Sequence, residues 1–182
     1  VTGAITALAE RVDELADLPC VGWTHLQPAA PTTAGYRLSL SLTDLASDLE
    51  RLRWVAHRLR GKGFKGAVGT RAGYVAALEG SEMTAEEMDA RAMARLGLPA
   101  FPVTSQVYSR KQDLEVLELL AGLAASAARF AFNVRLMQSP PFGEWHEGFA
   151  EGQVGSSAMP WTRNPIDAEN INSLARYVAA LP

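Results

Sequence analysis

Two adjacent serines lie in a run of small residues from Gly155 to Ala158, shortly before an Asn-Pro step. Residues with so little side-chain bulk let the backbone approach a ligand closely, and their N–H groups can face an anion. We expect Asn164 to be the N-cap of a following helix and Pro165 to be its first residue, so the positive end of the helix dipole faces the same region. This arrangement could bind a carboxylate. A flexible loop followed by an ordinary helix cap would use the same residues.

The stretch GSSAMPWTRNP, which begins at Gly155, resembles the GSSxMPxKxNP signature of the fumarase/aspartase superfamily. Three other stretches agree with the superfamily in the same order: WTHLQPAAPTT, FKGAVGT and SQVYSRKQDLEVL. Members are homotetrameric lyases that release fumarate from a succinyl-bearing substrate. Within the superfamily, the chain is most similar to members that act on succinylated purine precursors and nucleotides.

This resemblance implies an all-α fold, a bundle of long helices. Residues 1–182 would be the central helical domain, without the N-terminal domain and the C-terminal part that relatives have. The expected partners are a succinylated small molecule, fumarate and further copies of the chain, with a tetramer as the family pattern. We expect neither a metal nor a cofactor, and no Cys/His cluster has the spacing of metal ligands.

The resemblance also implies three catalytic residues. Ser156 matches the base that removes the Cβ proton, and His25 matches the acid that protonates the departing nitrogen. Each positioned proton transfer typically contributes about 10²- to 10⁴-fold to a rate. Glu169 falls seven residues past the signature lysine position, where related lyases have a glutamate that orients the histidine. Without the resemblance, His25 would be interpreted as a packing or capping residue and Glu169 as an acid of a first helical turn.

Four further residues match substrate contacts of the family. Thr24 and Ser157 would hydrogen-bond a substrate carboxylate, Asn164 would help to position it, and Gln106 matches a glutamine that contacts substrate. Spacing alone would equally make Gln106 a turn residue before a long helix.

At two positions the chain departs from the family pattern. Thr162 stands at the signature lysine, which removes a charge expected to stabilise the carboxylate next to the carbanion. The adjacent Arg163 could bind substrate and supply charge, although a planar guanidinium is not equivalent to an ammonium. Asn170 stands where close relatives have an arginine that contacts substrate. These changes indicate altered substrate choice or weak activity.

Relatives assemble each site from three subunits, and a second histidine and further phosphate contacts come from segments with no counterpart here. We therefore expect the 182-residue chain to be inactive by itself. Two other functions remain open. One is a superfamily lyase or cycloisomerase for a different dicarboxylate, which Thr162 and Asn170 favour. The other is a helical oligomerisation module without catalysis.

Apolar residues spaced by three and four predict the helices that would position these groups. The predicted helices cover residues 1–17, 33–59, 84–96, 114–134 and 166–181. Thr84 and Glu87 form a capping box for the third. Prolines keep residues 23–33 largely extended, and four glycines predict an irregular loop over 61–69. No strand pattern of any length is visible.

The helix over residues 114–134 is apolar nearly all round. Its charged residues are Glu115, Glu118 and Arg129. The longest uncharged run, Leu119 to Ala128, has ten residues, whereas a membrane span needs about 20. Such a helix must be buried nearly all round, so we expect another copy of the chain to cover it.

Composition limits the remaining functions. A content of 48% hydrophobic and 20% charged residues is ordinary for a globular protein, and the net charge of −3 gives no electrostatic case for binding nucleic acid or membranes. The single cysteine, Cys20, fits a cytoplasmic protein. Because the chain begins with Val1 and shows no signal-peptide pattern, we expect it to start inside a longer protein.

We assign no catalytic role to a basic cluster and two further histidines. Six basic residues between Arg51 and Lys65 predict a solvated face or a lining for an anionic substrate in an assembly, rather than a nucleic-acid contact. We interpret His57 and His146 as structural or exposed.

Overall fold

The computed structural model describes residues 1–182, which divide into two compact units. The first unit contains Val1–Leu52 and Leu117–Pro182, and the second contains Arg53–Val116. All five predicted helices are present: α1 (Thr2–Glu14), α2 (Ala34–Arg58), α4 (Ala85–Arg95), α5 (Lys111–Gln138) and α6 (Ile166–Val178). A short helix, α3 (Ala72–Ala77), was not predicted. The expected helical fold is therefore confirmed.

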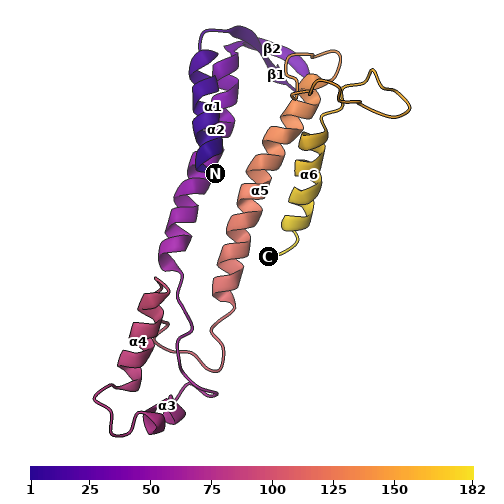
Figure 1. The fold of residues 1–182 in the computed structure, drawn as a ribbon. Coiled ribbons are helices and arrows are strands. Elements are labelled where there is room, and N and C mark those ends of the chain that lie inside the picture. The colour runs from indigo at the N-terminus through magenta and orange to yellow at the C-terminus, as the bar shows by residue number, and fades with distance from the viewer. The chain divides into compact units, whose positions relative to one another are not determined.

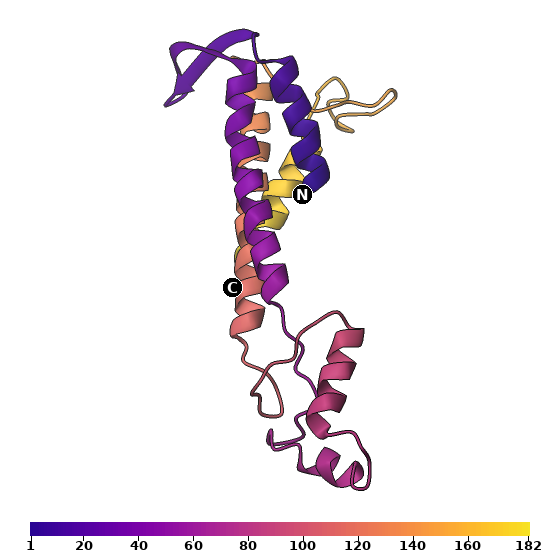
Figure 2. The same cartoon turned by 90° about the vertical axis from the view of Figure 1, so that its left-hand side faces the viewer.

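In the first unit, α1 lies along the first part of α2, and α6 lies along the last part of α5, as Figure 1 and Figure 2 show. The start of α2 approaches α1 so closely that a Cβ on Gly35 would overlap the Val12 carbonyl and the Ala16 backbone. The backbone N–H of Gly35 donates a 2.8 Å hydrogen bond to the Leu15 carbonyl. A glycine at this position therefore permits the close approach of the two helices.

Polar contacts join α5 to its neighbours within the first unit. Arg129 of α5 forms a 3.1 Å ion pair with Asp44 of α2. Asn172 of α6 is buried; it accepts a 2.9 Å hydrogen bond from Arg135 and donates a 2.8 Å bond to the Ala128 carbonyl. Because a buried amide left without partners is costly, these bonds fix α6 against α5.

The prediction that the chain has no strands is wrong. Strands β1 (Pro19–Thr24) and β2 (Gln27–Thr33) pair in antiparallel fashion and form a hairpin between α1 and α2. The extended conformation was expected, but the prolines hid the pairing because they lower β propensity and lack an N–H donor. A two-stranded sheet has only edge strands, and edge strands tolerate proline.

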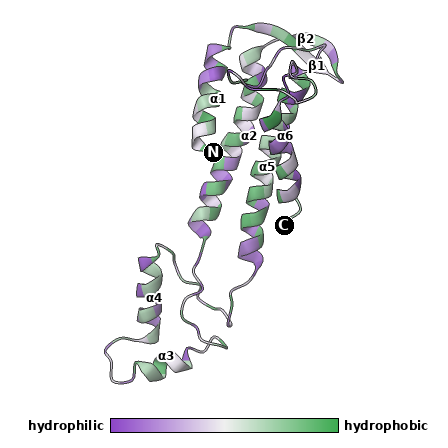
Figure 3. Cartoon of the chain, turned by 45° about the vertical axis from the view of Figure 1, so that its right-hand side comes forward, coloured by the Kyte–Doolittle hydropathy of each residue, from purple (hydrophilic) through white to green (hydrophobic).

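Helix α5 is less enclosed than its composition predicts. Hydrophobic residues predominate along it in Figure 3, yet only Leu119, Ala131 and Met137 are buried. Leu120 and Phe132 are 43% and 51% exposed. None of the helices combines the length and the apolar composition needed to cross a bilayer. The chain alone therefore leaves apolar surface on α5 uncovered.

The second unit is organised around a buried ion pair. Asp89 of α4 and Lys65 are each 2% exposed and contact each other directly. Asp89 also accepts a 2.8 Å hydrogen bond from the backbone N–H of Phe64 and lies 3.4 Å from the Arg71 guanidinium. Burial raises the pKa of the Asp89 carboxyl, but the hydrogen bonds from Lys65 and Phe64 outweigh it and lower the pKa below its ordinary value.

The Asp89→Asn substitution should destabilise the second unit because it leaves the Lys65 ammonium buried without a counter-charge. Removing one partner of a buried pair costs about 3–5 kcal/mol. A group with a lowered folded pKa stabilises the protein above its unfolded pKa, about 3.9 for aspartate. Wild type should therefore lose its advantage over the variant as the pH falls below about 4.

Urea unfolding at several pH values, with hydrogen exchange of residues 53–116, measures this difference. The exposed Glu82 provides a control, Glu82→Gln, that should leave stability nearly unchanged. Equal stability of Asp89→Asn and wild type at pH 7 would contradict the assignment.

Candidate active site

His25 and Leu26 form the two-residue turn of the hairpin. Both have positive φ angles, 52° and 59°, as the type I′ turn of a tight hairpin requires. Glycine, asparagine and aspartate usually occupy such positions, and a leucine there carries backbone strain of the kind that often accompanies functional sites. Both residues are exposed, and Thr24 pairs with Gln27 immediately beside them. A short, strained turn thus carries the predicted histidine.

The hairpin tip borders a hollow of about 570 Å³ in the first unit. Thr24 and His25 both line this hollow, so the two site residues predicted from the stretch WTHLQPAAPTT share one concave surface. The other side chains that matter here come from α2, α5 and the segment after α5: Tyr36, Arg37, Asn133 and Trp145.

Arg37 of α2 and Trp23 of the hairpin both contact Glu144 in the segment after α5. The Arg37 guanidinium forms an ion pair with Glu144, and its Cζ lies 5.1 Å from the centre of the Trp145 ring. Glu144 also accepts a 3.0 Å hydrogen bond from Nε1 of Trp23. Burial lowers the pKa of Arg37, but the hydrogen bonds with Glu144 and Cys20, together with the charge of Glu144, outweigh burial and raise the pKa above its ordinary value. The charged Arg37 side chain therefore holds together the residues that form this wall of the hollow.

The segment with the two serines forms an irregular loop that closes on itself. Nδ2 of Asn164 donates a 3.1 Å hydrogen bond to the Gly155 carbonyl. A Cβ on Gly155 would overlap the Thr162 carbonyl oxygen, so only glycine allows this approach. Oγ of Ser156 accepts hydrogen bonds from the backbone N–H groups of Ala158 and Met159, at 3.3 and 3.4 Å. Within the loop the backbone packs closely upon itself, and backbone donors face the Ser156 oxygen.

The expectation for the start of α6 is wrong. Pro165, not Asn164, is the N-cap, and it has no side-chain cap bond, because the Asn164 side chain is used within the loop. The carboxylate of Glu147 caps the helix instead and accepts hydrogen bonds from the backbone N–H groups of Asp167 and Ala168, at 2.9 and 3.0 Å. The positive end of the α6 dipole is therefore occupied by a carboxylate of the same chain.

Thr162 and Arg163, at and beside the signature lysine position, both turn to partners within the chain. Oγ1 of Thr162 donates a 2.9 Å hydrogen bond to the Met159 carbonyl. The Cζ of Arg163 lies 5.7 Å from the centre of the Phe149 ring. Arg163 is exposed, so its charge remains accessible from solvent.

Four other predicted positions are exposed. Glu169 lies in the first turn of α6 with Asn170 next to it, and Ser157 lies in the loop. Gln106 lies in the second unit, in the irregular segment between α4 and α5. None of these four side chains forms a hydrogen bond within the chain.

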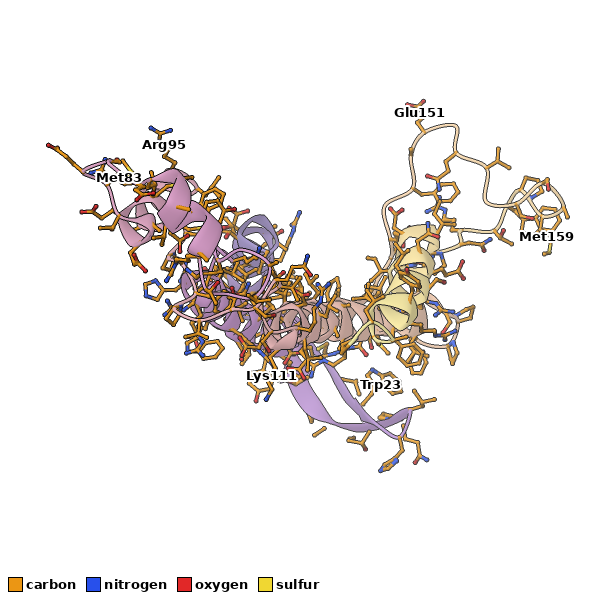
Figure 4. The ribbon with its side chains drawn as sticks, turned by 90° about the horizontal axis from the view of Figure 1, so that it is seen from below. Trp23, Met83, Arg95, Lys111, Glu151 and Met159 are labelled. Carbon is orange, nitrogen blue, oxygen red and sulfur yellow. The ribbon has the colours of Figure 1, made fainter.

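A single chain does not bring the predicted base and acid together. The hairpin and the serine loop are on different sides of the first unit in Figure 2. In Figure 4, Trp23 marks the hairpin, whereas Glu151 and Met159 lie on a loop that extends away from the helices in another direction. In the first unit, the predicted site residues thus form two separate groups: Thr24 with His25, and the residues from Ser156 to Glu169.

Sequence reasoning missed the residues that hold these groups, above all Glu147, Arg37 and Glu144. Arg37 pairs with Glu144 across 107 positions, and Glu147 contacts residues 20 and 21 positions later. Periodicity and local motifs contain no signal for contacts of this separation.

Comparison with known proteins gives consistent results. A family model described as lyase matches residues 3–180. Adenylosuccinate lyase of Saccharomyces cerevisiae is 40% identical over 178 residues, which are 97% of this chain and 36% of the yeast protein. Adenylosuccinate lyase of Archaeoglobus fulgidus is 42% identical over 171 residues, 94% of this chain and 37% of the archaeal protein.

A solved structure also matches. The crystal structure of 3-carboxy-cis,cis-muconate lactonizing enzyme from Pseudomonas putida aligns with a TM-score of 0.78 and 31% identity, over 96% of this chain and 37% of that one. The chain therefore spans a little over a third of the length of these proteins.

The Gly155→Ala substitution should open the serine loop, because the added Cβ would collide with the Thr162 carbonyl. The Thr162 N–H, which donates to the Met159 carbonyl at 3.1 Å, should then exchange faster. We expect exchange at this N–H to be about tenfold faster, which corresponds to a loss of about 1.4 kcal/mol in the free energy that keeps the loop closed.

Hydrogen–deuterium exchange of the 182-residue chain measures this change. Gly148→Ala is the matched control, since a Cβ at Gly148 would meet nothing within 4 Å. Similar exchange in the two variants would show that the close approach at Gly155 does not shape the loop.

Proposed function

The chain belongs to the lyase family, and from this premise we propose that it is the central helical part of an adenylosuccinate lyase. The reaction would release fumarate from adenylosuccinate and from the succinylated aminoimidazole carboxamide ribotide of purine biosynthesis. One observation carries the proposal: adenylosuccinate lyases from a yeast and an archaeon are 40% and 42% identical over nearly the whole chain. A cytoplasmic location accords with the single cysteine.

Ser156 is the proposed base for the elimination. It would take the proton from Cβ of the succinyl group, and the electron pair left behind would expel the nitrogen from Cα as the C–N bond breaks. Serine needs help to act as a base, and the backbone N–H groups of Ala158 and Met159 that face its oxygen favour the deprotonated form. Closure of the loop over substrate would strengthen these bonds by excluding water.

His25 is the proposed acid that protonates the departing nitrogen, and Glu169 would orient its ring. Thr24, Ser157 and Asn164 would bind the succinyl carboxylates, with Arg163 as the nearest positive charge. Gln106 would also contact substrate. No metal or cofactor is part of this proposal, because proton transfer and charge stabilisation suffice for the elimination.

Several copies of the chain are needed to complete this site. His25 and the loop of Ser156 lie apart within one chain, so the base and the acid would have to come from different subunits. The exposed Leu120 and Phe132 of α5 supply apolar surface that such an assembly would bury. We propose a homo-oligomer, a tetramer by the family pattern, and we expect the 182-residue chain alone to be inactive because other segments of the whole protein complete the site.

A second candidate function is supported by the structural match. The lactonizing enzyme from Pseudomonas putida acts on a muconate, as its name states, and the chain is 31% identical to it. Thr162 and Asn170 replace charged residues expected for a succinylated nucleotide, which favours a different dicarboxylate. A substrate panel that contains adenylosuccinate and 3-carboxy-cis,cis-muconate distinguishes the two functions.

In the full-length protein, Ser156→Ala and His25→Gln should each lower fumarate release from adenylosuccinate by at least about 10²-fold, because each removes one proton transfer. Equimolar mixing of the two inactive variants, followed by dissociation and reassembly, should restore part of the activity. Mixed oligomers would contain some sites with an intact serine loop from one copy and an intact histidine from another.

Absorbance assays of fumarate formation measure both effects, with His57→Gln as the control, since His57 is exposed and lies in α2. Full activity of Ser156→Ala would show that Ser156 is not the base of the elimination. Loss in both variants without recovery on mixing would argue against a site shared between copies.

Restoring the signature lysine tests the role of charge at this position. Thr162→Lys should raise kcat/KM for adenylosuccinate by about tenfold or more, since a missing electrostatic contact can cost about 10²- to 10³-fold. Thr162→Gln offers a long polar side chain without charge and should give no increase. An unchanged or lower kcat/KM in Thr162→Lys would show that another group already supplies this charge.

A further inference from the structure

Glu147 lies in the segment between α5 and the serine loop, and its carboxylate is bound at both oxygens. Oε1 accepts a 2.9 Å hydrogen bond from the backbone N–H of Asp167, and Oε2 accepts a 3.0 Å bond from that of Ala168. The first N–H groups of a helix have no partner inside the helix. Since α6 has no side-chain cap at its own N-cap residue, Glu147 satisfies two of these groups.

Gln138, the last residue of α5, holds the same region from the other side. Its Oε1 accepts a 2.9 Å hydrogen bond from the backbone N–H of Glu147, and its Nε2 donates to the Arg163 carbonyl. Residues 147 and 163 stand at the two ends of the serine loop. Gln138 therefore ties both ends to the end of α5, while Glu147 ties the first end to α6.

The start of α6, to which Glu147 ties this loop, is held firmly against α5. Ala168 is 4% exposed, and buried Asn172 is bonded to Arg135 and to the Ala128 carbonyl of α5. The far part of the loop is different, since Val154 and Trp161 are 63% and 76% exposed. The loop thus has a fixed stem and an exposed far part, and Ser156 lies in the far part, between Val154 and Trp161.

We propose that Glu147 and Gln138 form a clamp that positions two parts of the active site at once: the loop that carries Ser156 and the first turn of α6 that carries Glu169. This inference rests on the proposed function, because the roles of Ser156 and Glu169 do. Glu147 is a positioning residue and not a catalytic one, since both of its oxygens are bound to backbone N–H groups. Its effect on the reaction comes through the geometry of the groups it holds.

The clamp itself can be tested without any reaction. In Glu147→Gln the side chain keeps one acceptor oxygen and places an NH₂ group against a backbone N–H, so one of the two bonds is lost. The amides of Asp167 and Ala168 should then exchange faster with solvent in the 182-residue chain. Glu151→Gln is the matched control: Glu151 lies four residues further along and is exposed on the loop (Figure 4).

Kinetics of the full-length enzyme test the positioning role. Glu147→Gln should lower kcat for fumarate release by roughly 10- to 100-fold, because small misplacements of reacting groups cost rates of this size. KM should change less than about threefold, since the residue does not bind substrate. Gln138→Met, which keeps the side-chain volume and loses both polar contacts, should show the same division between kcat and KM.

The two measurements separate the possible failures. Unchanged exchange at Asp167 and Ala168 in Glu147→Gln would overturn the clamp, whatever the enzyme does. Faster exchange with an unchanged kcat would show that Glu147 only caps α6, and would overturn the positioning role. If wild type releases no fumarate from adenylosuccinate, the proposed function fails, and the exchange result still decides the clamp.

Discussion

Polar backbone groups that lack partners in regular structure determine how this chain builds its candidate site. The first N–H groups of α6 have no partner within the helix, and Glu147 supplies the missing acceptors from outside. The same need recurs in the second unit, where Asp89 accepts from the Phe64 N–H, and in the serine loop, where Asn164 donates to the Gly155 carbonyl. Loops that cannot form helices or strands are thus fixed by single side chains.

The helices could be predicted because their sequence signals are local. Contacts between residues far apart in the sequence could not be predicted. The capping box of Thr84 and Glu87 spans three positions and is present as predicted, with both reciprocal hydrogen bonds. The cap of α6 comes from Glu147, 20 positions upstream, and no short motif reports it. Asn164 appeared to be the N-cap from its place before Pro165, but its amide serves the loop. The reciprocal pair of Thr84 and Glu87 thus predicted its cap correctly, whereas the single residue Asn164 did not.

The candidate site shows the same division. The motifs marked His25, Ser156 and their neighbours by residue type, and the structure adds observations that accord with a site: a strained turn at His25 and two N–H donors on the Ser156 oxygen. The groups that hold them, Arg37 with Glu144 and Gln138 with Glu147, are ordinary polar residues in the sequence. Tertiary folding alone brings each pair together, so single-sequence reasoning could not find them.

The location of Glu147 also limits which positive groups could balance the two negative charges of a succinyl group. A helix N-terminus can bind a substrate carboxylate only while its N–H groups and dipole are free, and at α6 a carboxylate of the chain already occupies them. Thr162 brings no charge, and the nearest cation in the loop is Arg163, whose guanidinium lies over the Phe149 ring and remains exposed. A stacked, planar cation can still pair with a carboxylate through its edge. In the proposed enzyme, the charge that balances the substrate would therefore come from Arg163 and from cations of neighbouring copies, and the backbone donors of the loop would serve the Ser156 oxygen.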